Sequence, residues 1–184
     1  SDWLPGEVDS PVIDFHFGIR MGAMVRRLSL ERMLYIGAGS MPLLSRKQLT
    51  EVVGQLSRAG ERWAITNNLH SSDWLGITDA TVLLEAAAQL PRDNMLGWVL
   101  KHKAGFRLRA LPPSAATQLD IDTPTDLVAL RWHPGTNEQL RSFVAERLPS
   151  DPLARWKASA QFLTKPGSQI ALIGRVSPHT WQVL

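Results

Sequence analysis

Short apolar runs alternate with longer amphipathic stretches along this sequence, and that alternation constrains the fold more than any other feature. Three runs have the length and composition of buried strands: Met33–Ile36, Trp63–Thr66 and Phe106–Leu111. Between the first two runs, over residues 49–56, apolar side chains recur at the spacing of a helix face. Strands and helices that alternate in this way predict a mostly parallel α/β sheet.

A change in charge separates the last part of the chain from the rest. Residues 1–130 carry 13 Lys and Arg against 14 Asp and Glu, whereas residues 131–184 carry 7 against 3. The later part also lacks the alternation of strand and helix and contains two helical patterns instead. We therefore predict an α/β domain over residues 1–130 and a mainly helical C-terminal extension over 131–184.

The composition excludes several classes of protein. The net charge is only +3, so the pI near 9.7 reflects the absence of Cys and a single Tyr rather than a basic surface. No Lys or Arg run exceeds two residues, which argues against nucleic acid as a partner. No apolar stretch approaches the roughly 18 residues of a membrane span. The lack of Cys favours a cytoplasmic protein, and the oligomeric state is left open.

Ligands of open α/β sheets bind beyond the carboxyl ends of the strands, so the loops after the predicted strands are the candidate site. The most specific of these loops contains Asp120 and Asp122. Residues two apart in extended chain project to the same side, so both carboxylates can converge on a Mg²⁺ ion. Alternatively, the two carboxylates only favour the positive end of the helix that follows.

The loop after the first predicted strand consists of four small residues, Gly37, Ala38, Gly39 and Ser40. Its backbone N–H groups are suited to cradling a phosphate, and we expect it to contact a nucleotide. The alternative is that a strand-to-helix turn needs glycine here for its conformation alone.

The loop after the second predicted strand is polar throughout. Adjacent residues of one loop do not readily adopt the relay geometry of a Ser-His-Asp triad, so we expect substrate hydrogen bonding instead. The alternative is a loop tied by its side chains to its own backbone. Trp74 follows directly and can either stack on a ligand ring or pack in the core. The predicted acceptor-binding residues are Asn67, Asn68, His70, Ser71 and Asp73.

With these loops placed, the sequence resembles the MobA-like nucleotidyltransferase family. Leu119–Leu127 resembles the family's late segment, in which two Asp or Asn residues precede Thr-Pro. Ile36–Ser45 resembles its central segment, and Phe17–Met21 is similar to a Gly-x-Arg-Met helix start in related members. The three segments occur in the family's order and cover roughly residues 13–130.

The resemblance implies a three-layer α/β/α fold like that of nucleotide-diphospho-sugar transferases. It also implies transfer of a nucleoside monophosphate from a nucleoside triphosphate to a small phosphorylated acceptor, such as a cofactor precursor or sugar phosphate. Mg²⁺ or Mn²⁺ would assist, bound by Asp122 with Asp120 beside it. The alternatives are a non-catalytic module that binds a nucleotide or sugar nucleotide, and a glycosyltransferase that uses an Asp-x-Asp motif.

The sequence departs from the family's pattern at two points. No Gly-rich loop with Arg and Lys precedes Asp14, although such a loop cradles the triphosphate in the family. The central segment has Gly39-Ser40 where the family places a metal-binding Asp. Both departures predict either a fragment of a longer chain or a member that has lost its activity.

Overall fold

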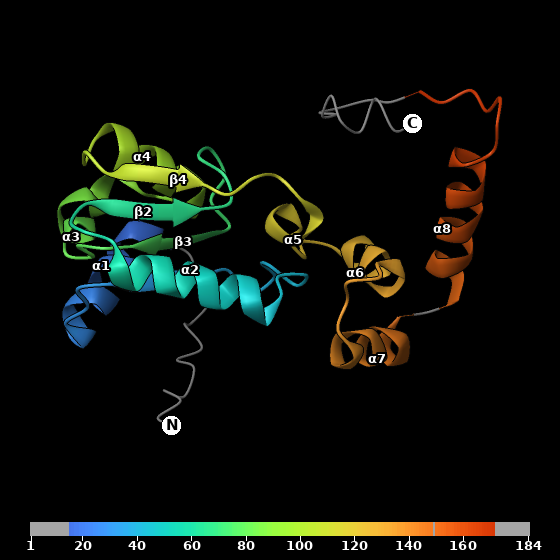
Figure 1. Cartoon of the computed structure of the whole chain (residues 1–184), viewed down its shortest axis with the longest axis horizontal. Coiled ribbons are helices and arrows are strands. Elements are labelled where there is room, and N and C mark those ends of the chain that lie inside the picture. The colour runs from blue at the N-terminus through green and yellow to red at the C-terminus, as the bar shows by residue number, and fades with distance from the viewer. Residues whose placement is uncertain (1–14, 149, 172–184) are drawn as a thin grey trace. The chain divides into compact units, whose positions relative to one another are not determined.

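The computed structural model describes residues 15–148 and 150–171, and the chain divides into two compact units. Unit 1 extends to Asp120, and unit 2 begins at Ile121. The division therefore falls before residue 130, the predicted end of the α/β domain. Figure 1 shows the elements of both units.

Unit 1 is built on a sheet of four short strands in the order β1-β3-β2-β4. Strand β3 pairs antiparallel with both β1 and β2, and β2 pairs parallel with β4. Each strand has four residues, and their bounds are β1 (Met33–Ile36), β2 (Trp63–Thr66), β3 (Trp74–Ile77) and β4 (Arg107–Ala110).

The predicted three-layer α/β/α fold with a mostly parallel sheet is wrong. Two of the three strand pairings are antiparallel, and helices outweigh the short strands among the described residues. The error arises at β3, which was not predicted as a strand. Its run is interrupted by Gly76 and follows a polar loop, so no four-residue apolar stretch marks it. The loop reverses the chain, and β3 therefore returns antiparallel beside β2.

One face of the sheet is covered by α1 (Phe17–Leu28), α3 (Val82–Ala86) and α4 (Leu96–His102). Alternate strand residues point toward these helices, including the fully buried side chains of Leu75 and Ile77. The short 3₁₀ turns η1 (Ala87–Gln89) and η2 (Asp93–Met95) link α3 to α4. This face holds the larger hydrophobic cluster of unit 1.

Helix α2 (Arg46–Arg58) packs on the opposite face, where its Val52 meets Ile65 and Trp74 of the sheet. The helix begins at a capping box, in which the Ser45 side chain accepts from the Gln48 amide and Gln48 reaches back to the Ser45 amide. The spacing of Ser45 and Gln48 in the sequence is that of a capping box. Helix α2 thereby starts close to the end of β1 and runs back along the sheet (Figure 1).

Unit 2 consists of helices among the described residues: α6 (Pro124–Trp132), α7 (Glu138–Arg147) and α8 (Ser150–Leu163). Helix α6 begins at a capping box formed by Thr123 and Asp126, with Pro124 in the first helical turn. Residues 172–184 of the predicted extension lie outside the described residues. Among the helices that the structure describes, none combines the length and apolarity needed to cross a membrane.

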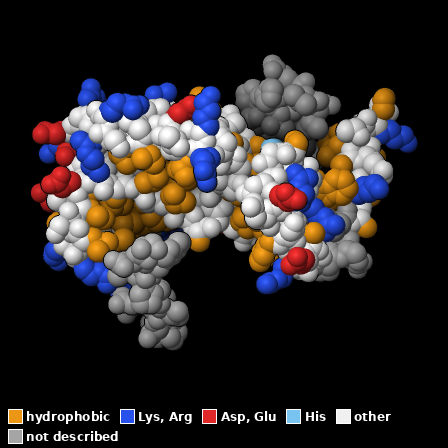
Figure 2. All heavy atoms as spheres, turned by 60° about the horizontal axis from the view of Figure 1, so that its bottom comes forward, with side chains coloured by type: hydrophobic (Ala, Val, Ile, Leu, Met, Phe, Trp, Pro, Cys, Tyr) orange, Lys and Arg blue, Asp and Glu red, His pale blue; other side chains and the backbone are white. Residues whose placement is uncertain are grey.

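Hydrophobic side chains reach the surface of unit 1 around its outer strand β1. Figure 2 shows apolar side chains gathered on the side of unit 1 that faces the viewer, with Lys and Arg side chains around them. The exposed large apolar side chains of these elements are Ile19, Met24 and Leu28 on α1, Ile36 on β1 and Val53 on α2.

The contact between α1 and the α3–η1 segment depends on the absence of a side chain at Gly18. A Cβ at this position would lie 2.2 Å from the carbonyl oxygen of Ala87. We expect Gly18→Ala to lower the free energy of unfolding by about 2 kcal/mol, as overpacking of a fixed backbone contact does. Gly60→Ala is the matched control, because a Cβ there meets nothing within 4 Å. Urea unfolding curves that shift equally for both variants would contradict this packing.

Candidate functional site at the end of the sheet

Strands β1, β2 and β4 run in the same direction, because β1 and β2 are both antiparallel to β3 and β4 is parallel to β2. Their carboxyl ends therefore lie at one edge of the sheet, together with the amino end of β3. This edge carries the loops in which the candidate site was predicted. The loops share this edge despite the wrong fold prediction, because the inserted β3 leaves the common direction of β1, β2 and β4 unchanged.

The loop after β1 is fixed to the start of β3 by hydrogen bonds to one backbone carbonyl. The Gly37 amide and the Ser40 hydroxyl both donate to the carbonyl oxygen of Asp73, at 3.0 and 2.9 Å. The Ser40 amide donates to the Gly37 carbonyl at 2.9 Å, which closes the turn. Ser40 also forms an antiparallel bridge with Asp120. Three loops thus meet within the described part of unit 1.

Gly37 is required at this junction for packing. A Cβ on it would lie 2.7 Å from the Ser40 hydroxyl oxygen and 3.0 Å from the Asp73 carbonyl oxygen. In contrast, the amides of Ala38 and Gly39 at the tip of the turn donate no hydrogen bond among the described residues. The predicted nucleotide contact at Gly37–Ser40 stays a prediction, and these two amides are the groups able to make it.

The loop between β2 and β3 is held by its own side chains, as the alternative interpretation of this loop predicted. Asn67 is buried and bonds twice to Asp73: its side-chain amide donates to the carboxylate, and its amide oxygen accepts from the Asp73 backbone N–H. The Ser72 hydroxyl donates to the Asn68 carbonyl at 2.7 Å. The Asn68 side chain accepts from the His70 amide at 3.0 Å.

The same loop contacts the segment after β4. The Gln118 side-chain amide donates to the Asn67 carbonyl at 3.0 Å, from the short helix α5 (Ala115–Gln118). Of the predicted acceptor-binding residues, Asn67 therefore has a structural role in the loop. His70 is exposed and Ser71 is half-buried, so their side chains remain within reach of a ligand.

Tyr35 and Asp93 belong to this edge but were not assigned to the site from the sequence. The Tyr35 hydroxyl donates to the Asp93 carboxylate at 3.2 Å, across 58 residues of sequence. Burial, the Asp93 charge and hydrogen bond, and the negative charges of Asp120 and Asp73 together raise the pKa of Tyr35 to about 12. Three carboxylates from three separate segments therefore act on one phenol.

These carboxylates make the edge of the sheet a region of negative potential. Among the residues that the structure describes, no group of three or more Asp, Glu or His side chains is arranged to enclose a metal ion. A hard cation such as Mg²⁺ commonly uses only one or two carboxylates and completes its shell with water and phosphate oxygens. Carboxylates such as Asp73 and Asp120 are of the chemical type that this mode of binding uses.

Asp120 and Asp122 fall on either side of the division between the units, so their convergence on one ion stays a prediction. Asp120 is half-buried beside Ser40. Asp122 is exposed, and its amide donates to the Asp126 carboxylate at 3.1 Å. Slight burial acts to raise the pKa of Asp126, but the hydrogen bonds from Thr123 and Asp122 outweigh it and lower this pKa.

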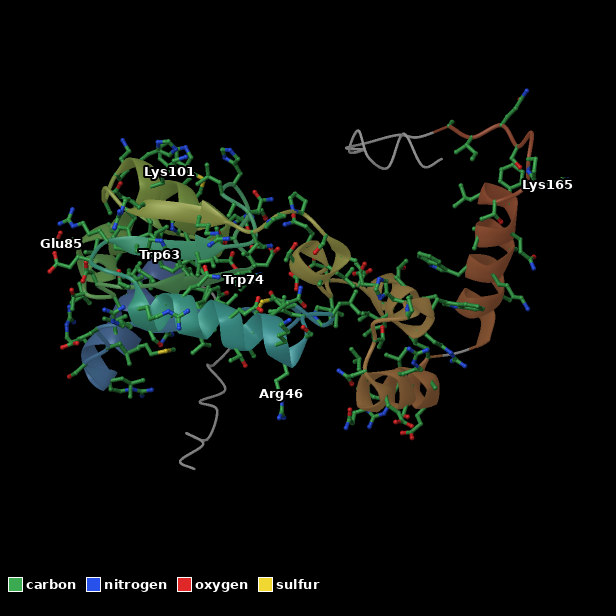
Figure 3. All side chains as sticks on the ribbon, viewed as in Figure 1. Arg46, Trp63, Trp74, Glu85, Lys101 and Lys165 are labelled. Atoms are coloured by element: carbon green, nitrogen blue, oxygen red, sulfur yellow. The ribbon has the colours of Figure 1, made fainter. Side chains whose placement is uncertain are left out.

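Trp74 packs in the core and is not a stacking surface for a ligand. Its side chain is fully buried between the sheet and α2, toward the end where α2 begins (Figure 3). Within the described part of the chain, its buried indole N–H has no hydrogen-bond partner. The alternative interpretation of Trp74, packing, is therefore correct.

Tyr35 and Asp93 could not have been found together from local sequence signals. Tyr35 lies within an apolar strand, and the sequence around Asp93 indicates an N-cap of the helix that follows. Their proximity is set by the packing of η2 against the sheet. The one signal available was that Tyr35 is the sole Tyr of the chain.

No protein-family model matches the sequence, and a search of curated proteins finds no significant match.

Because the chain has one Tyr, its phenol titration reports Tyr35 alone. Near pH 10 an ordinary Tyr is half ionised, whereas we expect Tyr35, with its pKa near 12, to be roughly one per cent ionised. Asp93→Asn removes a charge and weakens the acceptor, so the pKa should fall toward the ordinary value. The measurement is tyrosinate absorbance against pH, with Glu85→Gln as the control, since Glu85 is exposed on α3.

The sign of the linked stability follows from the same shift. The unfolded chain loses the Tyr35 proton near pH 10 and the folded chain only near pH 12, so the folded state binds more protons in between. The free energy of unfolding should therefore fall as the pH rises through this window. A phenol that titrates near pH 10 in the folded protein would contradict the described surroundings of Tyr35.

Proposed function

We propose that this chain is a nucleotidyltransferase-like protein whose site is the edge of the sheet where β1, β2 and β4 end. It would transfer a nucleoside monophosphate from a nucleoside triphosphate to a small phosphorylated acceptor, with Mg²⁺ or Mn²⁺. The observation that carries the proposal is the meeting of Gly37–Ser40, Asn67–Asp73 and Asp120 through the Asp73 carbonyl and the Ser40–Asp120 bridge. The absence of Cys suits a cytoplasmic location.

The carboxylates of this edge are suited to a divalent cation. Asp73 and Asp120 both raise the pKa of Tyr35, as does Asp93, so their charges act in a common region. A cation there would be attracted by these negative charges. When bound, Mg²⁺ would neutralise negative charge on the phosphate oxygens, which is a main requirement for phosphoryl transfer. Asp73 and Asp120 would hold it.

The remaining groups of the edge are suited to a phosphorylated ligand. The amides of Ala38 and Gly39 make no hydrogen bond among the described residues and can donate to phosphate oxygens. The exposed imidazole of His70 and the half-buried hydroxyl of Ser71 lie on the neighbouring loop, which we assign to the acceptor. The resemblance of the three sequence segments to MobA-like nucleotidyltransferases supports the same division of roles.

A second candidate is a non-catalytic module that binds a nucleotide or sugar nucleotide. Gly39-Ser40 supports this candidate, because the MobA-like family places a metal-binding Asp at this point of the segment. The Ser40 hydroxyl instead donates a hydrogen bond to the Asp73 carbonyl. A hydroxyl used in this way adds no negative charge to the cation site. Both candidates require nucleotide binding, and only the first requires release of pyrophosphate.

Thermal unfolding with nucleoside triphosphates, with and without Mg²⁺, tests the proposal. With the ligand at about 100 times its Kd for the Mg²⁺-dependent site, adding Mg²⁺ should stabilise the protein by about 2.7 kcal/mol beyond the nucleotide alone. Asp120→Asn should abolish this gain, whereas Glu85→Gln, which removes a carboxylate from α3, should retain it. Figure 3 labels Glu85 at the far end of unit 1 from Arg46, the first residue of α2.

The two candidates separate in a second measurement on the same samples. Pyrophosphate release in the presence of a sugar phosphate supports the transferase, and Mg²⁺-dependent binding without release supports the module. No Mg²⁺-dependent stabilisation by any nucleotide would contradict both.

A further inference from the structure

A pocket of unit 1 lies at the opposite end of the sheet from the carboxylate edge. Its volume is about 400 Å³, within the range of small-molecule sites. It is formed where α2 ends and β2 and β4 begin. The lining residues are Gln55, Arg58, Ala59, Gly60, Trp63 and Arg107.

Guanidinium groups surround this pocket. Arg58 and Arg107 line it, and within the described residues neither forms a salt bridge. Arg109 lies two residues beyond Arg107 on the same side of β4, and it donates to the Gln55 side chain at 3.0 Å. The Arg32 guanidinium donates to the carbonyls of Leu56 and Ala59 at the end of α2. Cationic groups without carboxylate partners favour an anionic ligand, and guanidinium forks match phosphate oxygens in particular.

The pocket also has an aromatic wall. Trp63 is half-buried: it packs against the cluster beneath α2 and also lines the pocket. Figure 3 labels it on the α2 side of the sheet, away from Trp74. An indole ring beside arginines is suited to a ligand that combines a flat ring with a phosphate group.

We propose that this pocket binds a nucleotide, with its phosphates on Arg58 and Arg107 and its base against Trp63. The site is distinct from the carboxylate edge, because Trp63 and Arg107 begin strands whose other ends form that edge. The edge offers carboxylates and needs a cation to accept phosphate, whereas the pocket supplies its own positive charge. Binding here should therefore not require a divalent ion.

Calorimetric titration of the full chain in EDTA tests the site without the contribution of a metal. ATP should bind, tripolyphosphate should bind about tenfold more weakly because it lacks the base, and adenosine should bind weakest because it lacks the phosphates. Arg107→Gln should weaken ATP binding about tenfold, since it removes one charge-assisted contact. Arg107 is exposed, so this variant is expected to fold.

Two control variants decide where the nucleotide binds. Arg26→Gln removes an equal charge from the exposed surface of α1 and should leave ATP affinity unchanged. Glu85→Gln alters an exposed carboxylate of α3 outside both sites and should also leave the metal-free affinity unchanged. Equal affinity for ATP and tripolyphosphate, equal loss in Arg107→Gln and Arg26→Gln, or no binding of ATP in EDTA would each overturn the proposal.

Discussion

The organisation of the candidate site depends on one backbone carbonyl, that of Asp73. It accepts hydrogen bonds from the Gly37 amide and the Ser40 hydroxyl, and so it joins the end of β1 to the start of β3. The approach is so close that a side chain at Gly37 would collide with both partners. Because Ser40 also bridges to Asp120, this one junction brings together segments that lie far apart in the sequence.

Short stretches of sequence were sufficient to predict some of the helices and strands. The apolar runs of β1 and β2 were identified correctly. The capping boxes at Ser45 and Thr123 each depend on two side chains three residues apart, so they too are encoded locally. Strand β3 was missed because Gly76 interrupts its apolar pattern. Its burial comes from its place between β1 and β2 and from the helices on both faces of the sheet. Its insertion between β1 and β2 made the sheet mixed, which alternation of strands and helices along the chain could not reveal.

The candidate site was predictable to the extent that it depends on strand ends. Gly37–Ser40, Asn67–Asp73 and Asp120 lie where strand direction places them, although Asn67 and Gly37 serve the loop structure itself. Tyr35 and Asp93 were not predictable, because their hydrogen bond joins the half-buried strand β1 to a helical turn far away in the sequence. The site thus combines locally encoded loops with a long-range contact that sets its electrostatic character.

The central claim is that these loops form one cation site, and paramagnetic broadening of backbone amide NMR signals by Mn²⁺ tests it most directly. Substoichiometric Mn²⁺ should first broaden the amides of Gly37–Ser40, Asn67–Asp73 and Asp120 together, and excess Mg²⁺ should restore them. Broadening that first appears around Glu85, or that spreads evenly over the surface carboxylates, would contradict a common site at this edge of the sheet.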